Sequence, residues 1–495
     1  MRIAPTLEEF TRLAEDRRVI SVYATLLADD LTPVAVYQAL CGAREGTFLF
    51  ESAEAGVWSR YSFVGVRTAA TLTELDGKAH WVGHPLAGVG DGDPLTALRT
   101  TLQQLATPVV DGLPPFHAGM VGYLGYDVVR RLERLPDTTV DDLELPELVM
   151  MLTSELAVFD HHRGELWLIA NAINFDGTDE GVERAYYGAV AAVEAMAEEV
   201  RAPRPSFAAQ EGEPATLAIT RQRTSEEYMA MVEEAKEEIR AGEAFQIVVS
   251  QRFDIPITAD ALEVYRALRL TNPSPYLYLL RLPGFDVVGS SPEALVTVQD
   301  GVVTTRPIAG SRPRGATPEE DRRLGEELLA DPKERAEHLM LVDLGRNDLG
   351  RICKPGSVTV HEFMNIHRYS HIMHLEAAVS GRLAYGRSAL DAVLACFPAG
   401  TLSGAPKVRA MEIIDRLEVS RRGLYGGVVG YFDFAGNSDV AIAIRTAVLS
   451  DGVAHVQAGA GIVADSVPET EDAECRHKAQ AVITALARAE AMGTA

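Results

Sequence analysis

The stretch Ala294-Leu295-Val296-Thr297-Val298-Gln299-Asp300-Gly301-Val302-Val303-Thr304-Thr305 contains two β-rich runs on either side of an Asp-Gly pair. Asp-Gly is a strong signal for a two-residue hairpin turn, because both residues readily adopt positive φ. The two runs are therefore expected to pair antiparallel. A further β-rich run upstream, residues 245–253, predicts another strand.

Helical patterns alternate with these strands in blocks. A capping sequence at Thr224-Ser225 opens a run with apolar residues at helical spacing. Thr317 and Asp331 are expected to cap two later helices, and Glu334 to close a capping box with Asp331. We expect helices over residues 225–242, 259–270, 318–330, from 332 onward, and 467–492. Helix blocks separated by paired strands favour an α+β layered fold over strict βαβ alternation.

The clearest break in the pattern is the segment 201–215, which contains three prolines and where the periodicity of apolar residues vanishes. We interpret it as a linker between an N-terminal domain, residues 1–200, and a C-terminal domain, residues 216–495. The N-terminal residues lead directly into an acidic helical pattern, without the apolar core of a signal peptide.

The charge balance excludes some classes of partner. The 495 residues include 46 basic and 71 acidic side chains, a net charge of −25. This charge repels nucleic-acid backbones and anionic lipid surfaces, and the longest uncharged runs fall short of the roughly 20 apolar residues of a membrane-spanning helix. We expect a cytoplasmic protein without nucleic-acid or membrane partners. Four cysteines without a paired motif, Cys41, Cys353, Cys396 and Cys475, are expected to be buried thiols.

Two acidic pairs are candidate metal ligands. Glu334 and Glu337, and likewise Glu471 and Glu474, are three residues apart on predicted helices, so both carboxylates of a pair share one face. If the two faces met, they would offer an oxygen-rich site for Mg²⁺, with Glu337 and Glu474 as direct ligands. From spacing alone, a capping role for Glu334 and an ion pair between Glu474 and Lys478 are the commoner outcomes.

Three other segments are candidates for binding or proton transfer. The small residues Gly459, Ala460 and Gly461 are interpreted as a Gly-rich turn whose N–H groups a ligand carboxylate can approach. Arg445 is a lone cation in an apolar strand, explained about equally well by a bound carboxylate or by an edge-strand arginine reaching water. His374 suits proton transfer, although a structural histidine is commoner, and His371 with His374 lacks the further ligands of a zinc site. The segment 401–407, taken alone, favours a turn.

Together these segments resemble the chorismate-utilising enzymes, and within them the family of anthranilate synthase large subunits (component I). The resemblance covers nearly the whole chain and is carried by several long motifs in the family's order. They are Ser291-Pro292-Glu293, Arg306-Pro307-Ile308-Ala309-Gly310, Glu337-His338-Leu339-Met340-Leu341-Val342-Asp343-Leu344-Gly345-Arg346-Asn347-Asp348, Gly400-Thr401-Leu402-Ser403-Gly404-Ala405-Pro406-Lys407, Leu424-Tyr425-Gly426-Gly427 and the segment 459–468.

The resemblance implies a layered α/β/β/α sandwich with mainly antiparallel sheets, in which an N-terminal regulatory region is interleaved with a C-terminal chorismate-binding domain. It implies conversion of chorismate and ammonia to anthranilate and pyruvate, the first step of tryptophan biosynthesis. Mg²⁺ would lie on Glu337 and Glu474, supported by Glu334 and Glu471. The substrate would be held by Gly310, Ser311, Tyr425, Arg445, Gly459, Ala460 and Gly461, and the catalytic residues would be Glu293, His374, Thr401 and Lys478.

Residues at two positions distinguish this chain from related enzymes that catalyse other reactions. Ala309 stands where aminodeoxychorismate synthases often carry a lysine that attacks the ring. Gln246 stands where isochorismate and salicylate synthases use a lysine to activate water. Both residues favour ammonia as the nucleophile. Aminodeoxychorismate synthase stays the closest enzyme rival, and a catalytically silent tryptophan-binding regulator is the rival that is not an enzyme.

The resemblance also implies a tryptophan feedback pocket and a partner. The pocket residues would be Glu51, Ser52, Asn272, Pro275, Tyr276, Leu277, Val429 and Tyr431. Phe50, Leu277 and Ser311 depart from the residues usual in the family. The chain has no glutaminase nucleophile turn, since Cys41 lacks the preceding glycine, so a separate glutamine amidotransferase subunit is implied, in a heterotetramer.

Overall fold

The hairpin centred on Asp300-Gly301 forms as the sequence predicts. In the computed structural model, β12 (Ala294–Gln299) pairs antiparallel with β13 (Val302–Thr305), with Val298 opposite Val303. Asp300 and Gly301 have φ values of 50° and 72°, the positive values that a tight hairpin turn requires. The structure describes residues 1–53, 60–203, 212–368 and 372–492.

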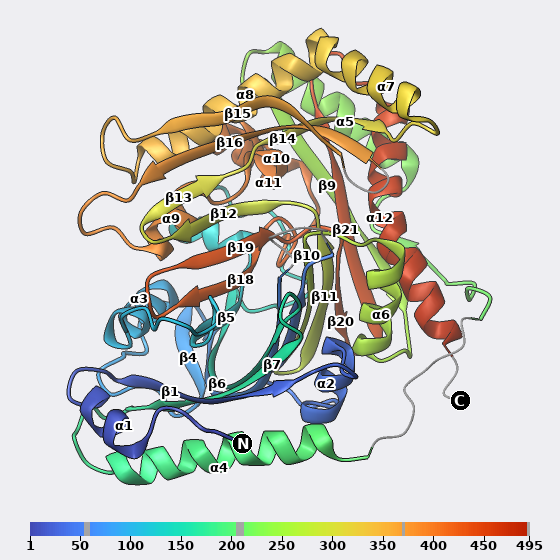
Figure 1. Ribbon diagram of the computed structural model, residues 1–495. Coiled ribbons are helices and arrows are strands. Elements are labelled where there is room, and N and C mark those ends of the chain that lie inside the picture. The colour runs from blue at the N-terminus through green and yellow to red at the C-terminus, as the bar shows by residue number, and fades with distance from the viewer. Residues whose placement is uncertain (54–59, 204–211, 369–371, 493–495) are drawn as a thin grey trace.

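Antiparallel strands from both halves of the chain join into one hydrogen-bonded network (Figure 1). The strands of the N-terminal half are β1 (Val19–Leu27), β2 (Thr47–Glu51), β3 (Tyr61–Leu75), β4 (Lys78–Gly83), β5 (Gly119–Leu124), β6 (Leu148–Asp160) and β7 (Glu165–Ile173). Those of the C-terminal half, besides β12 and β13, are β8 (Thr220–Arg221), β9 (Gln246–Pro256), β10 (Tyr276–Leu282), β11 (Phe285–Ser291), β14 (Ile308–Pro313), β15 (Thr359–Arg368), β16 (Ile372–Arg382), β17 (Gly404–Ala405), β18 (Val428–Asp433), β19 (Ser438–Ile442), β20 (Thr446–Ser450) and β21 (Val453–Ile462).

The two halves of the chain are interleaved at two strand pairs. β2 pairs with β10, with Leu277 opposite Glu51, and β5 pairs with β18, with Tyr431 opposite Val121. The predicted interleaving of an N-terminal with a C-terminal region is therefore confirmed. The domain division at residues 201–215 stays a prediction, and part of that segment, residues 204–211, lies outside the described residues.

The layers follow from which face of each strand is apolar. An inner cluster that includes Tyr123, Met151, Tyr278 and Val448 fills the space between two sheet layers. Helices cover the outer faces, where two further apolar clusters lie. One side carries α1 (Leu7–Leu13), α2 (Pro33–Leu40), α4 (Val182–Arg201), α5 (Ser225–Arg240), α6 (Ala261–Thr271) and α12 (Pro468–Ala491). The other carries α3 (Pro94–Gln104), α8 (Pro332–Gly350) and α9 (Ala389–Cys396). This is the predicted α/β/β/α sandwich.

The helix boundaries show which capping predictions hold. Thr224 and Thr317 accept hydrogen bonds from the third backbone N–H of α5 and of α7 (Pro318–Ala330), and Asp331 accepts from the first turn of α8. The expected capping box at Asp331 is wrong, because the Glu334 side chain accepts a hydrogen bond from Arg312 at 3.4 Å. This leaves the Glu334 carboxylate facing β14 rather than the helix start.

Two segments expected to be turns are regular structure. Residues 457–461 lie inside β21, paired with β9, so the predicted Gly-rich turn is wrong. Residues 401–407 contribute to α10 (Gly400–Ser403), to β17 and to the start of α11 (Lys407–Leu417). In both cases pairing with β9 overrides the local preference of small residues for turns.

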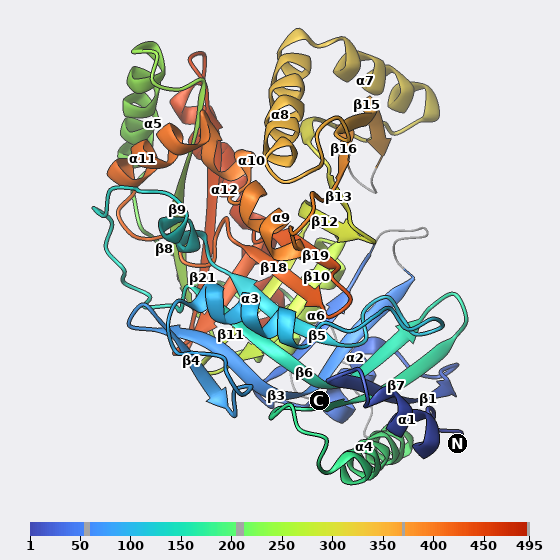
Figure 2. The ribbon, with the colours of Figure 1, turned by 90° about the vertical axis from the view of Figure 1, so that its left-hand side faces the viewer.

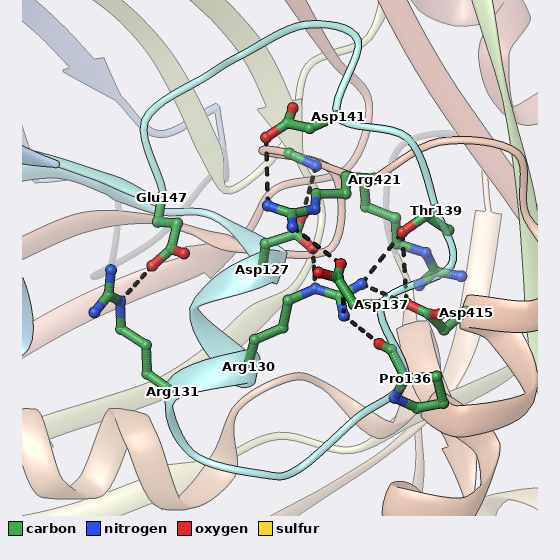
Figure 3. Close-up of polar contacts among 12 residues, drawn as sticks. Asp127, Arg130, Arg131, Pro136, Asp137, Thr139, Asp141, Glu147, Asp415 and Arg421 are labelled. Carbon is green, nitrogen blue, oxygen red and sulfur yellow. Dashed lines mark hydrogen bonds and ion pairs between the residues drawn. The ribbon is translucent and has the colours of Figure 1, made fainter. Parts of the chain in front are cut away.

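A cluster of polar side chains links the N-terminal half of the chain to α11 of the C-terminal half (Figure 3). Arg130, in the 3₁₀ helix η2 (Tyr126–Arg131), pairs with Asp127 at 3.0 Å and with Asp415 of α11. Thr138 donates from its backbone N–H and its hydroxyl to Asp415, at 2.9 and 2.7 Å. Each buried carboxylate in this cluster thus has an arginine or backbone donor.

All four cysteines are buried and free, as predicted. Among the described residues, no helix combines the length and the apolar character needed to span a bilayer.

Candidate active site

The two acidic pairs approach each other from α8 and α12. Burial raises the pKa of Glu337, and the neighbouring charges of Glu334 and Glu474 raise it further, while Lys333 and a hydrogen bond from Gln246 oppose the shift. Burial likewise raises the pKa of Glu471, where a hydrogen bond from Ser466 lowers it and Glu474 raises it. Since the charge of Glu474 raises the pKa of carboxyl groups on both helices, the two acidic faces lie near each other, which spacing alone could not show.

The chemistry of these donors fits a hard dication. Carboxylate oxygens are the ligands that Mg²⁺ prefers, and it typically takes one or two of them and fills its other positions with water or substrate. Within the described ranges of the chain, no group of three or more His, Cys, Asp or Glu side chains forms a metal cage by itself. Glu337 and Glu474 therefore fit an open Mg²⁺ site rather than a closed structural one.

Glu293 is an enclosed carboxyl group beside α10. It follows β11 and receives a hydrogen bond from the Thr401 hydroxyl at 3.1 Å. Burial raises the pKa of Glu293 to about 7, although Thr401, Arg445 and Lys478 all oppose the shift. A carboxyl group with this pKa can hold a proton near neutral pH and donate it, as a general acid requires.

Arg445 lies between β19 and β20, and the expectation that it sits within a strand is wrong. Its backbone has φ of 52°, outside the strand region. Burial lowers the pKa of Arg445, and the hydroxyl of Tyr425 and the carboxylates of Glu293 and Glu474 raise it. The charge of the Arg445 guanidinium therefore interacts with the carboxyl group of Glu293 and with Glu474, one of the proposed metal ligands.

β21 offers open backbone groups next to these charges. Its pairing with β20 ends at Val456, and among the described strands none pairs with residues 457–462 on that edge. On the other edge Gly459 packs so closely against β9 that a Cβ would lie 2.4 Å from the Val249 carbonyl oxygen. The Lys478 ammonium donates to the Gly459 carbonyl at 3.1 Å and pairs with Glu474 at 2.7 Å. The small residues Gly459, Ala460 and Gly461 are thus held beside the acidic pair.

β14 and β16 contribute Gly310, Ser311 and His374. A bulge follows Ala309, and Ser311 then lies opposite His374. Gly310 has φ of 66°, a conformation that favours glycine, and a Cβ there would lie 2.8 Å from a Glu334 carboxylate oxygen. The backbone carbonyl of Gly310 accepts a hydrogen bond from Nδ1 of His374 at 2.9 Å. Burial lowers the pKa of His374, which favours a neutral ring whose Nε2 can accept a proton.

A buried ion pair fixes the elements under the site. Arg422 pairs with Glu418 at 2.6 Å and donates to the backbone carbonyls of Leu402 and Val248. Glu418 also accepts hydrogen bonds from the backbone N–H and the hydroxyl of Ser250. This network joins α11, α10 and β9, and so positions the segment that carries Thr401.

Four residues near the acidic pairs were not predicted to take part. The charge of Lys333 lowers the pKa of Glu337 and of Glu471. Ser466 hydrogen-bonds Glu471, and Gln246 hydrogen-bonds Glu337. Arg312 donates a hydrogen bond to Glu334. Gln246 was singled out only as a mark of the reaction class. Lys333 could have been found from its place in the first turn of the helix that carries Glu337, whereas Arg312 and Ser466 become neighbours only through the fold.

The residues predicted to bind tryptophan lie around the start of β10, some on the inner face of the sheet and some on the outer face. Tyr276, Val429 and Tyr431 belong to the inner cluster, and the Tyr276 hydroxyl donates to Asp439 at 3.0 Å. Tyr431 lies opposite Asp439 in the β18–β19 pair and stacks on Phe116 at 4.4 Å between ring centroids. These three side chains form an aromatic, partly polar surface.

The other predicted tryptophan residues lie behind or beside this surface. The carboxylate of Glu51 accepts a hydrogen bond from Tyr265 of α6 at 2.6 Å and pairs with Arg269 at 3.0 Å. Leu277, opposite Glu51, is buried in the outer cluster. Ser52, Asn272 and Pro275 lie in the connections next to these strands, where the backbone N–H of Ala53 donates to Ser274.

The comparisons with known proteins identify the family of the chain. Residues 45–484 match the family described as chorismate binding enzyme. The anthranilate synthase component 1 of Mycolicibacterium smegmatis is 56% identical over 490 residues, which cover 97% of this chain and 93% of that protein.

Solved structures show the same arrangement. The crystal structure of anthranilate synthase component I from Streptococcus pneumoniae has a TM-score of 0.78 at 36% identity, covering 92% of this chain and 98% of that one. The menaquinone-specific isochorismate synthase of Escherichia coli has a TM-score of 0.71 at 20% identity, covering 97% of this chain and 98% of that one, which shows a shared fold alone. The chain belongs to the family of chorismate binding enzymes and, within it, to the anthranilate synthase component 1 proteins.

Proposed function

We propose that this chain is the large subunit of a cytoplasmic anthranilate synthase that converts chorismate and ammonia to anthranilate and pyruvate, the first step of tryptophan biosynthesis. The observation that carries the proposal is a series of charge interactions that links the residues of the site. Arg445 interacts with both Glu293 and Glu474, and Glu474 interacts with Glu337. These interactions support a single site that combines an acid, a cationic anchor and an open pair of metal ligands.

The chain's own residues would bind a dianionic substrate against an unfavourable net charge of −25. Arg445, Lys478 and the open edge of residues 459–461 supply the positive groups, and Tyr425 and Ser311 supply hydroxyls. Glu337 and Glu474 would hold Mg²⁺, which supplies Lewis-acid charge for the ring carboxylate of chorismate. Glu334 and Glu471 would support it through water.

Two groups are suited to move the protons of the reaction. Glu293, with a pKa of about 7, would protonate the hydroxyl that leaves ring position 4 as ammonia attacks position 2. The Thr401 hydroxyl orients this acid. His374, whose Nδ1 is occupied by Gly310, would take a proton on Nε2 during the elimination of pyruvate.

Two residues support amination over the reactions of relatives. Ala309 has no nucleophile with which to attack the ring, and it lies buried next to the bulge at Gly310. The Gln246 amide hydrogen-bonds Glu337 and is too weakly basic to activate water. Identification of the aminated product distinguishes anthranilate synthase from aminodeoxychorismate synthase.

The activity test uses the full chain with chorismate, Mg²⁺ and ammonium. We expect anthranilate, the ortho-amino product identified by fluorescence and chromatography, with one pyruvate per anthranilate. Glutamine should replace ammonium only after a glutamine amidotransferase subunit is added. A para-aminated product would favour aminodeoxychorismate synthase, and absence of pyruvate would favour a silent regulator.

We further propose tryptophan feedback through the surface of Tyr276, Val429 and Tyr431. An aromatic effector can pack against Tyr431, and the Tyr276–Asp439 hydrogen bond offers it a polar partner. Tyr276→Phe removes a hydrogen bond to a carboxylate, so the tryptophan concentration for half-inhibition should rise about tenfold. Unchanged inhibition in this variant would argue against the pocket.

A further inference from the structure

A second cavity lies far from the acidic pairs, where α1 and β1 meet the turn after β18. Its volume is about 370 Å³, within the range of pockets that bind small organic molecules. Residues of the loop 107–118 form one wall, and Asp433, Phe434 and Ala435 close it from the C-terminal half. In Figure 1, α1 and β1 lie together near the N-terminus. None of the predicted substrate, metal or tryptophan residues lines this cavity.

Arginines give the cavity a positive wall on a strongly negative protein. Arg2, Arg12 and Arg17 line it. Within the described part of the chain, Arg2 and Arg12 form no ion pair with a carboxylate, and Arg17 pairs only with the exposed Asp16, at 3.4 Å. The atom of Arg17 in this pair is its buried Nε, which makes no hydrogen bond of normal geometry among the described residues. An anion in the cavity would therefore offer Arg17 a better-placed acceptor than Asp16 does.

The two acidic residues of the lining already have partners. The Glu9 carboxylate accepts hydrogen bonds from the backbone and hydroxyl of Thr6, at 3.0 and 3.2 Å. These bonds, and then the charges of Arg12 and Arg2, lower the pKa of Glu9. Asp433 is buried and accepts hydrogen bonds from the backbone and side chain of Asn437. These bonds leave the carboxylate charges in place, so the lining has three arginines against two acidic residues.

The rest of the lining is apolar or neutral. Leu13, Val19, Leu113 and Phe434 contribute apolar side chains. Burial lowers the pKa of His117, and its Nδ1 donates to the Pro114 carbonyl at 3.2 Å, so the ring is neutral near neutral pH. This combination suits a ligand with a charged end and an apolar body.

We propose that this cavity is a binding site for a small organic carboxylate, whose anionic group lies against Arg12 and Arg17 and whose apolar body lies against Leu113 and Phe434. The site also touches the predicted effector surface. The cavity wall includes His117, next to Phe116, which stacks on Tyr431 at 4.4 Å. Binding there is expected to alter the tryptophan response, whereas binding itself does not depend on the proposed function.

The test is isothermal titration of the full chain with benzoate, which carries both a carboxylate and an apolar ring. We expect binding in the millimolar range, as suits so few atoms. Inorganic phosphate, which lacks the apolar body, and benzyl alcohol, which lacks the charge, should both bind more weakly. Either of them binding as tightly as benzoate would overturn the proposed ligand class.

Variants locate the site. Arg12→Gln with Arg17→Gln should weaken benzoate binding about tenfold or more, because two charged donors are lost. Leu113→Trp should abolish binding by filling the cavity. The matched control, Arg322→Gln with Arg323→Gln, removes two exposed arginines of α7 and should bind benzoate as the wild type does. No binding to the wild type, or equal affinity in the Arg12/Arg17 double variant with a native melting curve, would overturn the proposal.

Discussion

Two carboxylates of this chain, Asp415 and Glu337, have opposite surroundings. Asp415 is buried in the polar cluster of Figure 3, where hydrogen bonds from Arg130 and Thr138 outweigh burial and lower its pKa. Glu337, on α8, has carboxylates as neighbours, and burial together with Glu334 and Glu474 raises its pKa. A structural carboxylate has its counter-charge built in, whereas a set that repels itself is typical of a site that receives a cation.

Glu337→Gln should have the largest effect on activity. Loss of a proposed direct ligand of Mg²⁺ would remove several kcal/mol of charge stabilisation, so ammonium-dependent anthranilate formation should fall at least about a thousandfold. The melting temperature should stay the same or rise, because a repulsive pair is relieved. The rate is followed by anthranilate fluorescence, with Glu326→Gln on the exposed face of α7 as the control. Near-normal turnover would remove Glu337 from the site.

Arg130→Gln should have the reverse effect, a loss of stability with little change in activity. It leaves Asp127 and Asp415 buried without their guanidinium, a change that costs about 3–5 kcal/mol of stability. Urea denaturation followed by circular dichroism measures this loss, and the rate per folded molecule should change little. A loss below about 1 kcal/mol would mean that the comparison between the two carboxylate groups is wrong.

The pH dependence of the turnover rate tests the proposed role of a third carboxyl group, Glu293. Burial raises the pKa of this group to about 7, and its proposed role needs the protonated form. The turnover rate should therefore be highest below pH 7 with respect to this group and fall tenfold per pH unit well above it. In Glu293→Gln the remaining slow rate should lack this decline. A decline that persists in the variant would assign the titration to another group.

Lys333→Ala should have the smallest effect. Lys333 lowers the pKa of both Glu337 and Glu471, so it also repels a dication in the same place. Its removal should tighten Mg²⁺ binding by about 2–3-fold, which corresponds to an exposed ion pair of under about 1 kcal/mol. The Mg²⁺ dependence of the rate measures this change, and weaker Mg²⁺ binding would contradict it.

Much of the fold could be predicted from local sequence. The Asp300-Gly301 hairpin and the caps at Thr224, Thr317 and Asp331 depend on neighbouring residues, and all four are confirmed. The predicted turn at 457–461 was wrong because pairing with β9, some 200 residues away, decides its conformation. Arg445 was expected in a strand because its apolar neighbours suggested one, but its positive φ depends on the crossing between β19 and β20.

The site was only partly predictable for the same reason. Spacing identified the two acidic helix faces but could not show that they meet, nor that Gln246, Arg312 and Ser466 contact them. The division of the predicted tryptophan residues between two faces of β10 follows from the alternation of side chains along a strand. That alternation is local, but which face is the inner one depends on the layers.

Calorimetric titration of the full chain with Mg²⁺ tests the central claim most directly, because it needs no substrate. The account predicts one Mg²⁺ per chain in the wild type and in a control with Glu326→Gln and Glu327→Gln, and none in the double variant Glu337→Gln with Glu474→Gln. Equal Mg²⁺ binding by the double variant and the wild type would contradict the assignment of α8 and α12 as the two walls of the metal site.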